Sequence, residues 1–327
     1  MAKEKIWSYF IQLSDHMWLD ETSKRKSWVL QPPYEMPYTE ENKTDLAVWD
    51  ETIAYVAKTQ FNMVIVDVGD GLQYEKHPEI SAPDAWSKDF LKKKLDEMRA
   101  LGLEPIPKLN FSTGHDTWLK QYRRMISTPQ YYQVCKDLID EVCEVFGNPR
   151  LFHLGLDEED TGHQALHDMT IIRSQELWWH DAYFLFDQLA SHGARPWIWG
   201  DSNWYHPEAF AEKMPRDILV SNWFYYALTD YPKDSVNYTR LAGYEKLEAL
   251  GFEQVPGVST WSINSNALET MLYAEKIMKP EHIGGFLTIP WCHTTRANQY
   301  VLINDAYRFY LARQSVYPDT LKPCDIV

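Results

Sequence analysis

Short apolar runs rich in β-branched and aromatic residues alternate along the chain with longer stretches of helical periodicity. Eight of the short runs have the length and composition of buried strands, at residues 6–13, 62–69, 104–111, 150–156, 195–200, 217–224, 254–261 and 284–291. Helices are predicted at residues 45–61, 85–103, 129–147, 174–194, 238–252 and 266–279, with a last one at 296–314. Several of these stretches end in glycine, which helix C-termini favour.

Regular alternation of strands and helices predicts a parallel sheet, and eight such units predict closure into an α/β fold of the (β/α)8 TIM barrel type. The length of 327 residues suits one barrel, so residues 1–327 are expected to form a single domain. Residues 22–43 are rich in proline and charge and are expected to form a long loop over the barrel mouth.

Composition narrows the possible partners. The net charge of −15 arises from 47 acidic and 32 basic residues, without a long basic run, so no nucleic acid is expected as a partner. No apolar stretch reaches the roughly 20 residues of a membrane span, and the N-terminus is interpreted as a strand rather than a signal peptide. The four cysteines show no disulfide framework or zinc spacing, which favours a reduced, cytoplasmic setting. The oligomeric state is left open.

Active sites of TIM barrels lie at the C-terminal ends of the strands. The stretch FHLGLDEEDTGH, residues 152–163, follows the fourth strand and contains four consecutive acids with histidines on both sides. Tryptophans end the fifth to eighth strands, at Trp199, Trp223, Trp261 and Trp291. Core layers of such barrels favour valine, isoleucine and leucine, so an aromatic box for the apolar face of a sugar is predicted. Packing under loops is the alternative for each tryptophan.

Carboxylates between aromatic walls are suited to glycoside hydrolysis, in which one carboxylic acid protonates the leaving oxygen. Glu158 is the predicted proton donor, and burial beside tryptophan is expected to raise its pKa. The sixth and seventh strands end without an acid that could serve as a nucleophile. Substrate assistance, in which a 2-acetamido group attacks the anomeric carbon, solves this problem and assigns Asp157 to steadying that group. A helix N-cap is the alternative role for the pair.

These residues resemble those of glycoside hydrolase family 20, the β-N-acetylhexosaminidases. FHLGLDEE at 152–159 resembles the His-x-Gly-Gly-Asp-Glu signature of the family, and IPKLNFSTGH at 106–115 resembles its third-strand motif. WIWGD at 197–201, VSNW at 220–223 and IPW at 289–291 are similar to its later strand ends. The resemblance implies that Asp157 orients the acetamido group, that Glu158 is the general acid and base, and that Trp199, Trp223 and Trp291 line the sugar pocket.

The chain also departs from the family pattern. Asn110 stands where the family tends to have Asp, and the first strand ends LSDHMW without the sugar-binding Arg. Trp261 stands where a Tyr is expected, with Tyr225 or Tyr226 as its possible replacement, and His293 replaces a Glu. The small α/β domain that commonly precedes the barrel is not found in this sequence. These departures leave the sugar and its linkage open.

Further substrate-binding candidates are His115, His153, Asp201 and Tyr225, each close to a predicted strand end. His153 and His115 are equally compatible with structural roles, and Asp201 with a turn. Three other functions remain: a carbohydrate-binding barrel without activity, a glycosidase for a sugar lacking the acetamido group that uses Asp201, and a metal-dependent hydrolase. The metal set would be His16, His115, His153 and Asp201. The favoured hypothesis needs a carbohydrate substrate and no metal or other cofactor.

Overall fold

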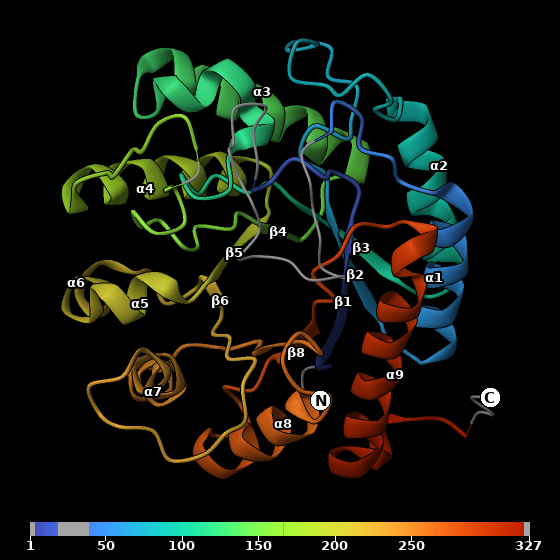
Figure 1. Ribbon diagram of the computed structural model, residues 1–327, viewed down its shortest axis with the longest axis vertical. Helices are drawn as coiled ribbons and strands as arrows, with labels where there is room; N and C mark the ends of the chain where they lie inside the picture. Colours follow the sequence, from blue (N-terminus) through green and yellow to red (C-terminus); the bar gives the residue numbers. More distant parts are fainter. Residues whose placement is uncertain (1–3, 19–38, 166, 324–327) are drawn as a thin grey trace.

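The structure, a computed structural model, describes residues 4–18, 39–165 and 167–323 (Figure 1). Most of the loop predicted at 22–43 lies outside the described residues. Strands form a ring at the centre of the view, and helices surround it. In the described part of the chain no helix has both the length and the apolar character that a membrane crossing requires.

Eight parallel strands form the central sheet, in the order β6-β5-β4-β3-β2-β1-β8-β7. Their bounds are β1 Ile6–Gln12, β2 Met63–Asp67, β3 Glu104–Lys108, β4 Leu151–His153, β5 Arg195–Trp199, β6 Leu219–Ser221, β7 Gly257–Val258 and β8 Gly285–Thr288. Two isolated bridges, Val220 to Gln254 and Trp223 to Gly257, join the β6 and β7 segments. These bridges bring the two edges together, so the predicted (β/α)8 barrel is confirmed.

Side chains of the strands alternate between two hydrophobic layers, as the two-residue period of a strand requires. In β1, Ile6 and Phe10 point into the barrel, whereas Tyr9 and Ile11 pack outward against the helices. The inner layer is filled by Ile6, Phe10, Met63, Ile65, Ile106, Leu151, Trp197, Leu219 and Leu287. The barrel interior is therefore a packed core, and ligands have access to its ends only.

The helices cover the outside of the barrel, and their bounds are α1 Leu46–Lys58, α2 Lys88–Ala100, α3 Pro129–Phe146, α4 Gln175–Ser191, α5 Asp201–Tyr205, α6 Pro207–Lys213, α7 Val236–Ala249, α8 Asn266–Ile277 and α9 Gln299–Val316. Short 3-10 helices occupy Thr117–Met125, Arg296–Asn298 and Pro318–Thr320. The helix ends follow local chemistry. Asp45 caps α1 by accepting hydrogen bonds from two backbone N–H groups. Helix α3 starts with a proline and is followed by Gly147 in the left-handed conformation.

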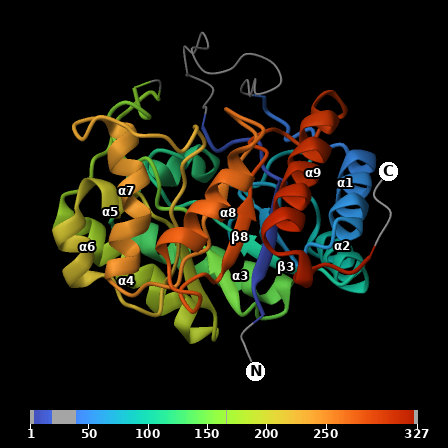
Figure 2. The same ribbon diagram turned by 90° about the horizontal axis from the view of Figure 1, so that it is seen from below.

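The structure differs from the sequence prediction mainly at the ends of strands. The fourth strand was expected to reach residue 156, but β4 ends at His153 because Gly155 and Leu156 have φ of 74° and 63°. The sixth and seventh strands are also shorter than predicted, and helices α5 and α6 fill a segment where no helix was predicted. The lost strand ends form the loops of the mouth. Figure 2 shows the barrel from the side, with the N-terminus of the chain at the bottom and these loops at the top.

A buried ion pair lies inside the upper part of the barrel. Lys108 at the end of β3 is fully buried, and its Nζ lies 2.8 Å from Oδ2 of Asp67 at the end of β2. Burial raises the pKa of Asp67, and the charge of Lys108 opposes this effect. Each group compensates a charge that the interior could not otherwise hold.

We expect Lys108→Met to lower the free energy of unfolding by about 3–5 kcal/mol, because it leaves the Asp67 carboxylate buried without its cation. The double variant Lys108→Met with Asp67→Leu should recover most of this loss, since it removes both charges. Chemical denaturation of the three proteins measures the effect. A double variant as unstable as the single one would show that packing, and not the unpaired charge, causes the loss.

Candidate functional site

The segment after β4 is held in a fixed turn at the C-terminal mouth of the barrel. Gly155 packs against Asn110 so closely that a Cβ atom would lie 2.0 Å from the Asn110 side-chain oxygen. Ser112 donates a hydrogen bond to the backbone carbonyl of Asp157, and the N–H of Glu158 donates to Oδ1 of Asp201 at 3.2 Å. Glu158 itself has a φ of 52°, a conformation that is uncommon for a residue with a side chain. Loops after three strands therefore fix the direction of both acids.

Asp157 is buried and has a partner at each carboxylate oxygen. The Asn110 amide donates to Oδ1 at 2.9 Å, and His115 Nε2 lies 3.3 Å from Oδ2. The first bond explains the role of Asn110 in this chain: an aspartate at that position would place a second negative charge against Asp157. The predicted His115 thus lies at the acid pair.

Two histidines hold the carboxylate of Glu158. His115 Nε2 lies 3.1 Å from Oε2, and His163 Nε2 lies 3.1 Å from Oε1. Burial alone would raise the pKa of Glu158, but the hydrogen bonds and charges of the two histidines outweigh it and hold the pKa well below its usual range. The expectation that burial would raise this pKa is therefore wrong, because the two histidines stabilise the carboxylate.

Asp201, the first residue of α5, lies behind the pair and is buried. Its Oδ2 accepts a hydrogen bond of 2.8 Å from the Trp223 indole, and its other oxygen accepts from the N–H of Glu158. Burial, followed by the negative charges of Asp157 and Glu158, raises the pKa of Asp201 well above its usual range. Both oxygens are engaged with protein groups, so Asp201 connects the acid pair to the aromatic side chains.

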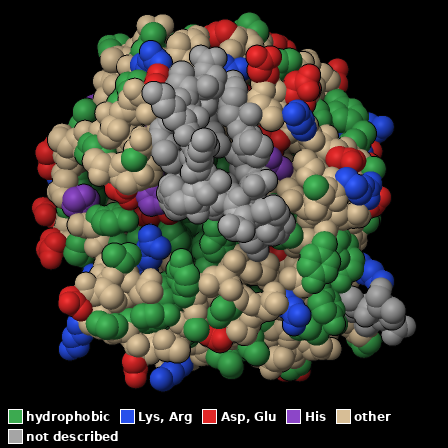
Figure 3. Space-filling model, viewed as in Figure 1, with side chains coloured by type: hydrophobic (Ala, Val, Ile, Leu, Met, Phe, Trp, Pro, Cys, Tyr) green, Lys and Arg blue, Asp and Glu red, His purple; other side chains and the backbone are tan. Residues whose placement is uncertain are grey.

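The predicted aromatic residues gather on the side of the mouth formed by the ends of β5 to β8. Trp223 and Tyr225 stack with ring centroids 5.0 Å apart, and Trp291 lies 6.0 Å from Trp199 and 6.5 Å from Tyr225. Trp261 and Trp291 are partly buried and pack against this cluster, which includes the more deeply buried Trp199. Figure 3 shows hydrophobic side chains on this face of the molecule, over the β6 side of the barrel.

His153 lies beneath the mouth and not in it. Its side chain is 0% exposed, and its ring packs against Trp197 and Trp199 at 5.4 and 4.7 Å. Burial, with the nearby charge of Lys108, lowers the pKa of His153 well below its usual range, so the imidazole is neutral. Its Nδ1 accepts the N–H of Gly155 at 3.1 Å. This predicted substrate-binding residue instead supports the turn and Trp199.

The metal set considered from the sequence is not assembled. The two ring nitrogens of His16 bond to Asp70, at 2.6 Å, and to the carbonyl of Thr39. His153 is enclosed below the mouth, as described above. Among the described residues, one group of three possible metal ligands, His115, Asp157 and Glu158, has ligand atoms that all lie within 4.8 Å of one another. The contacts of His115 with both carboxylates account for this proximity.

Two further mouth residues occupy the β1–β8 side. His293 Nδ1 lies 3.6 Å from Asp15 Oδ2, and both side chains are buried. Among the described residues, none offers a hydrogen-bond partner to Asp15 Oδ1 or His293 Nε2. Burial lowers the pKa of His293 to about 4, with a smaller contribution from His16. Both residues therefore retain hydrogen-bonding capacity at this side of the mouth.

The site contains residues that the sequence analysis did not select. His163 bonds to Glu158, and Trp18 packs against the rings of Trp291 and His115 at 5.8 and 6.0 Å. The sequence did contain one signal for His163. This residue follows Glu158 by five positions in an acidic, glycine-containing stretch, and such a stretch can turn back on itself. Nothing in the local sequence around Trp18 indicated its partners.

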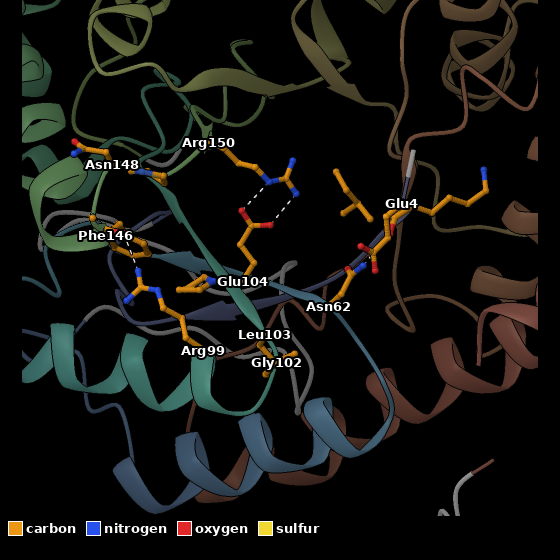
Figure 4. Close-up of a pocket in the computed structure, with 14 residues that line it drawn as sticks. Glu4, Asn62, Arg99, Gly102, Leu103, Glu104, Phe146, Asn148 and Arg150 are labelled. Atoms are coloured by element: carbon orange, nitrogen blue, oxygen red, sulfur yellow. Dashed lines mark hydrogen bonds and ion pairs between the residues drawn. The ribbon is translucent and has the colours of Figure 1, made fainter. Parts of the chain in front are cut away.

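Two pockets differ in their relation to these residues. One of about 410 Å³ adjoins the acid pair and is lined by Glu158, Asp160, Trp178, Asp201 and Tyr205, among others. Another, of about 650 Å³, lies at the N-terminal ends of the strands (Figure 4). Its wall carries an ion pair in which Arg150 donates two hydrogen bonds of 2.7 Å to Glu104. The opposite end of a barrel serves stability, so this second pocket is not part of the candidate site.

Several solved structures have a fold similar to that of this chain. A β-N-acetylhexosaminidase from Bacteroides fragilis NCTC 9343 matches with a TM-score of 0.60 and 12% identity over 98% of this chain and 72% of that one. A family 20 β-N-acetylhexosaminidase from Streptomyces coelicolor A3(2) gives 0.60 and 13% over 97% and 70%. A family 20 exo-β-N-acetylglucosaminidase from Vibrio harveyi, in complex with N-acetylglucosamine, gives 0.60 and 12% over 97% and 57%.

By sequence, no protein-family model and no curated protein matches the chain. The structural neighbours are family 20 β-N-acetylhexosaminidases, which confirms the resemblance expected from the motifs. What is shared is the (β/α)8 barrel. At 12–13% identity, the likeness establishes this fold, and the activity has to be argued from the residues of the site.

We expect Gly155→Ala to destabilise the protein by more than the roughly 1 kcal/mol that a left-handed backbone costs a residue with a side chain. The added methyl group would collide with Asn110 and displace it from Asp157. Gly193→Ala is the matched control, because Gly193 has a φ of 71° like the 74° of Gly155 but has no atom within 4 Å of the added Cβ. Equal melting temperatures for the two variants would contradict the role of the Gly155–Asn110 contact.

Proposed function

We propose that this protein is a glycoside hydrolase that cleaves a β-linked N-acetylhexosaminide with retention, by substrate-assisted catalysis. The observation that carries the proposal is the Asp157–Glu158 pair, fixed at the barrel mouth by Asn110 and His115 and facing an aromatic wall. The family 20 barrels of the structural neighbours, which are β-N-acetylhexosaminidases by their descriptions, support the same reaction.

The two acids have different tasks in this proposal. Glu158 donates a proton to the leaving oxygen while the acetamido carbonyl oxygen of the substrate bonds to the anomeric carbon. Asp157 accepts the acetamido N–H and stabilises the positive charge that develops on that group. Glu158 then accepts a proton from the water that opens the cyclic intermediate. Its location beside His115 and His163 favours the carboxylate that this second step needs.

The rest of the mouth fits a sugar ring. Trp291 and Trp261 offer partly buried aromatic surface at the mouth, beside the buried Tyr225, and aromatic faces suit the apolar face of a sugar. Asp15 Oδ1 and His293 Nε2, which have no partner in the part of the chain that the structure describes, can exchange hydrogen bonds with hydroxyl groups. They stand at the side where the family pattern predicts an arginine and a glutamate, so the contacts to the hydroxyl groups differ from those of the family.

Two alternatives use the same residues. In a glycosidase for a sugar without the acetamido group, Asp201 would act as nucleophile or base, and its two oxygens would do so beside the Trp223 indole and the backbone N–H of Glu158. In a carbohydrate-binding barrel without activity, the aromatic wall would remain and turnover would be lost. The absence of the expected arginine and glutamate favours that alternative, and the intact acid pair favours the enzyme.

We expect Glu158→Gln to retain the fold and sugar binding while slowing the cleavage of substrates with poor leaving groups by about 10²–10⁴-fold, the usual worth of general acid catalysis. Activated aryl N-acetylhexosaminides should lose less, because their leaving group needs little protonation. Steady-state kinetics over a series of aryl leaving groups measures the effect. Binding of sugar by the wild type without any product would support the inactive carbohydrate-binding barrel instead.

We expect Asp157→Asn to slow activated and poor substrates alike, by about 10²–10³-fold, because it removes the negative charge that stabilises the acetamido group in the transition state. A thiazoline that imitates the cyclised intermediate should bind the wild type tightly and the variant weakly. Inhibition constants and the hydrolysis of matched glucosides and N-acetylglucosaminides measure this. Equal hydrolysis of both sugars, with no inhibition by the thiazoline, would exclude substrate assistance.

A further inference from the structure

The carboxylate of Glu158 is one end of a chain of three side chains. His163 Nε2 lies 3.1 Å from Oε1 of Glu158, and its Nδ1 lies 2.8 Å from Oδ2 of Asp160. An imidazole between two carboxylates donates at both nitrogens only when it is protonated. The geometry therefore describes a cationic His163 between two carboxylates.

The loop holds this chain in place before any substrate binds. Oδ1 of Asp160 accepts hydrogen bonds from the N–H groups of Gly162, at 2.7 Å, and His163, at 2.9 Å. Asp160 thus shapes the turn that returns His163 toward Glu158 and at the same time fixes its ring. The Glu158 side chain is 19% exposed and that of His163 27% exposed, so water screens the contact only in part.

The ionisable groups around this pair belong to several elements. On the same loop are Asp157 and Asp160, while the other groups are His115 after β3, Asp201 at the start of α5, and Tyr225 after β6. Burial would lower the pKa of His163, but the hydrogen bonds and charges of Asp160 and Glu158 raise it to about 10. At neutral pH the shared proton therefore lies on His163 when no substrate is bound.

We propose that His163 is a positioning residue that shares a single proton with Glu158, so that the pair, and not Glu158 alone, is the proton source of the reaction. This inference rests on the proposed function. In the first step the proton passes from His163 Nε2 through the Glu158 carboxyl group to the leaving oxygen, which keeps the electrons of its bond to the anomeric carbon. The acetamido oxygen forms the new bond to that carbon.

The second step restores the pair. Water adds its oxygen to the anomeric carbon, the bond to the acetamido oxygen breaks, and the proton of the water returns through Glu158 to His163. The number of protons on the pair is the same before and after a turnover. The active form carries one proton on the pair, so activity extends to the alkaline pH at which His163 loses it, well above the pH at which an ordinary carboxyl group ionises.

We expect His163→Gln to move the alkaline limb of the kcat/KM profile to lower pH by more than about one unit, because Glu158 then loses its proton without the help of the imidazole. Activity at the acid side should change less. Asp160→Asn should move the same limb in the same direction by a smaller amount. His192→Gln is the matched control: His192 also lies 2.8 Å from a carboxylate, that of Asp140, and its side chain is 23% exposed, but it lies outside the site.

A titration of the histidine ring nitrogens by NMR tests the pair without any turnover. In the wild type His163 should stay protonated beyond pH 8, and in Glu158→Gln and Asp160→Asn its pKa should fall toward the ordinary histidine value of about 6.5, while that of His192 stays constant. Circular dichroism identifies a variant that fails to fold. If one of Glu158→Gln and Asp160→Asn fails, the titration of the other provides the test.

The outcomes separate this inference from the proposed function. A protein that cleaves no glycoside would contradict the function, and the titration would still decide the pair: coupling between His163 and Glu158 supports a shared proton. An ordinary pKa for His163 in the wild type, or one that Glu158→Gln leaves unchanged, overturns the inference. An active enzyme whose alkaline limb is the same in His163→Gln overturns it as well.

Discussion

The contact between Gly155 and Asn110 is the constraint on which the mouth of this barrel depends. Only a residue without a Cβ atom can approach the Asn110 amide so closely, and only glycine accepts the local φ of 74° at little cost. This approach places the amide on Asp157, and the following turn brings Glu158 to the two histidines. The identity of one small residue thus sets the orientation of both acids.

A second constraint is the cost of holding so many acids in a confined space. Asp157, Glu158 and Asp201 lie close enough that their charges raise the pKa of Asp201 in addition to burial. The protein compensates with His115 and His163, and with the indole of Trp223, which donates to Asp201. Among the described residues, the groups that bond to these three carboxylates are imidazoles and neutral amide, indole and backbone donors.

The departures from the family pattern have a common physical sense. An amide at residue 110 avoids a further negative charge beside Asp157, and His293 lies beside Asp15 at the side of the mouth where the pattern predicts an arginine and a glutamate. Each change keeps the local charge balanced while it alters the hydrogen-bonding groups that face the ligand. In the proposed function, different sides of the mouth therefore carry the reaction and the recognition of the sugar.

The sequence by itself determined the barrel, since alternating strand and helix periods can bury their apolar faces in few other ways. It also located Asp157, Glu158 and the tryptophans that follow the later strands, because the strand ends of such a barrel meet at one rim. Only the tertiary structure decided that Glu158 is held as a carboxylate, that His153 is buried below the mouth and that His163 belongs to the site. These depend on side chains that approach across loops from different strands, and the free energy of a buried charge is set by such neighbours and not by the residue itself.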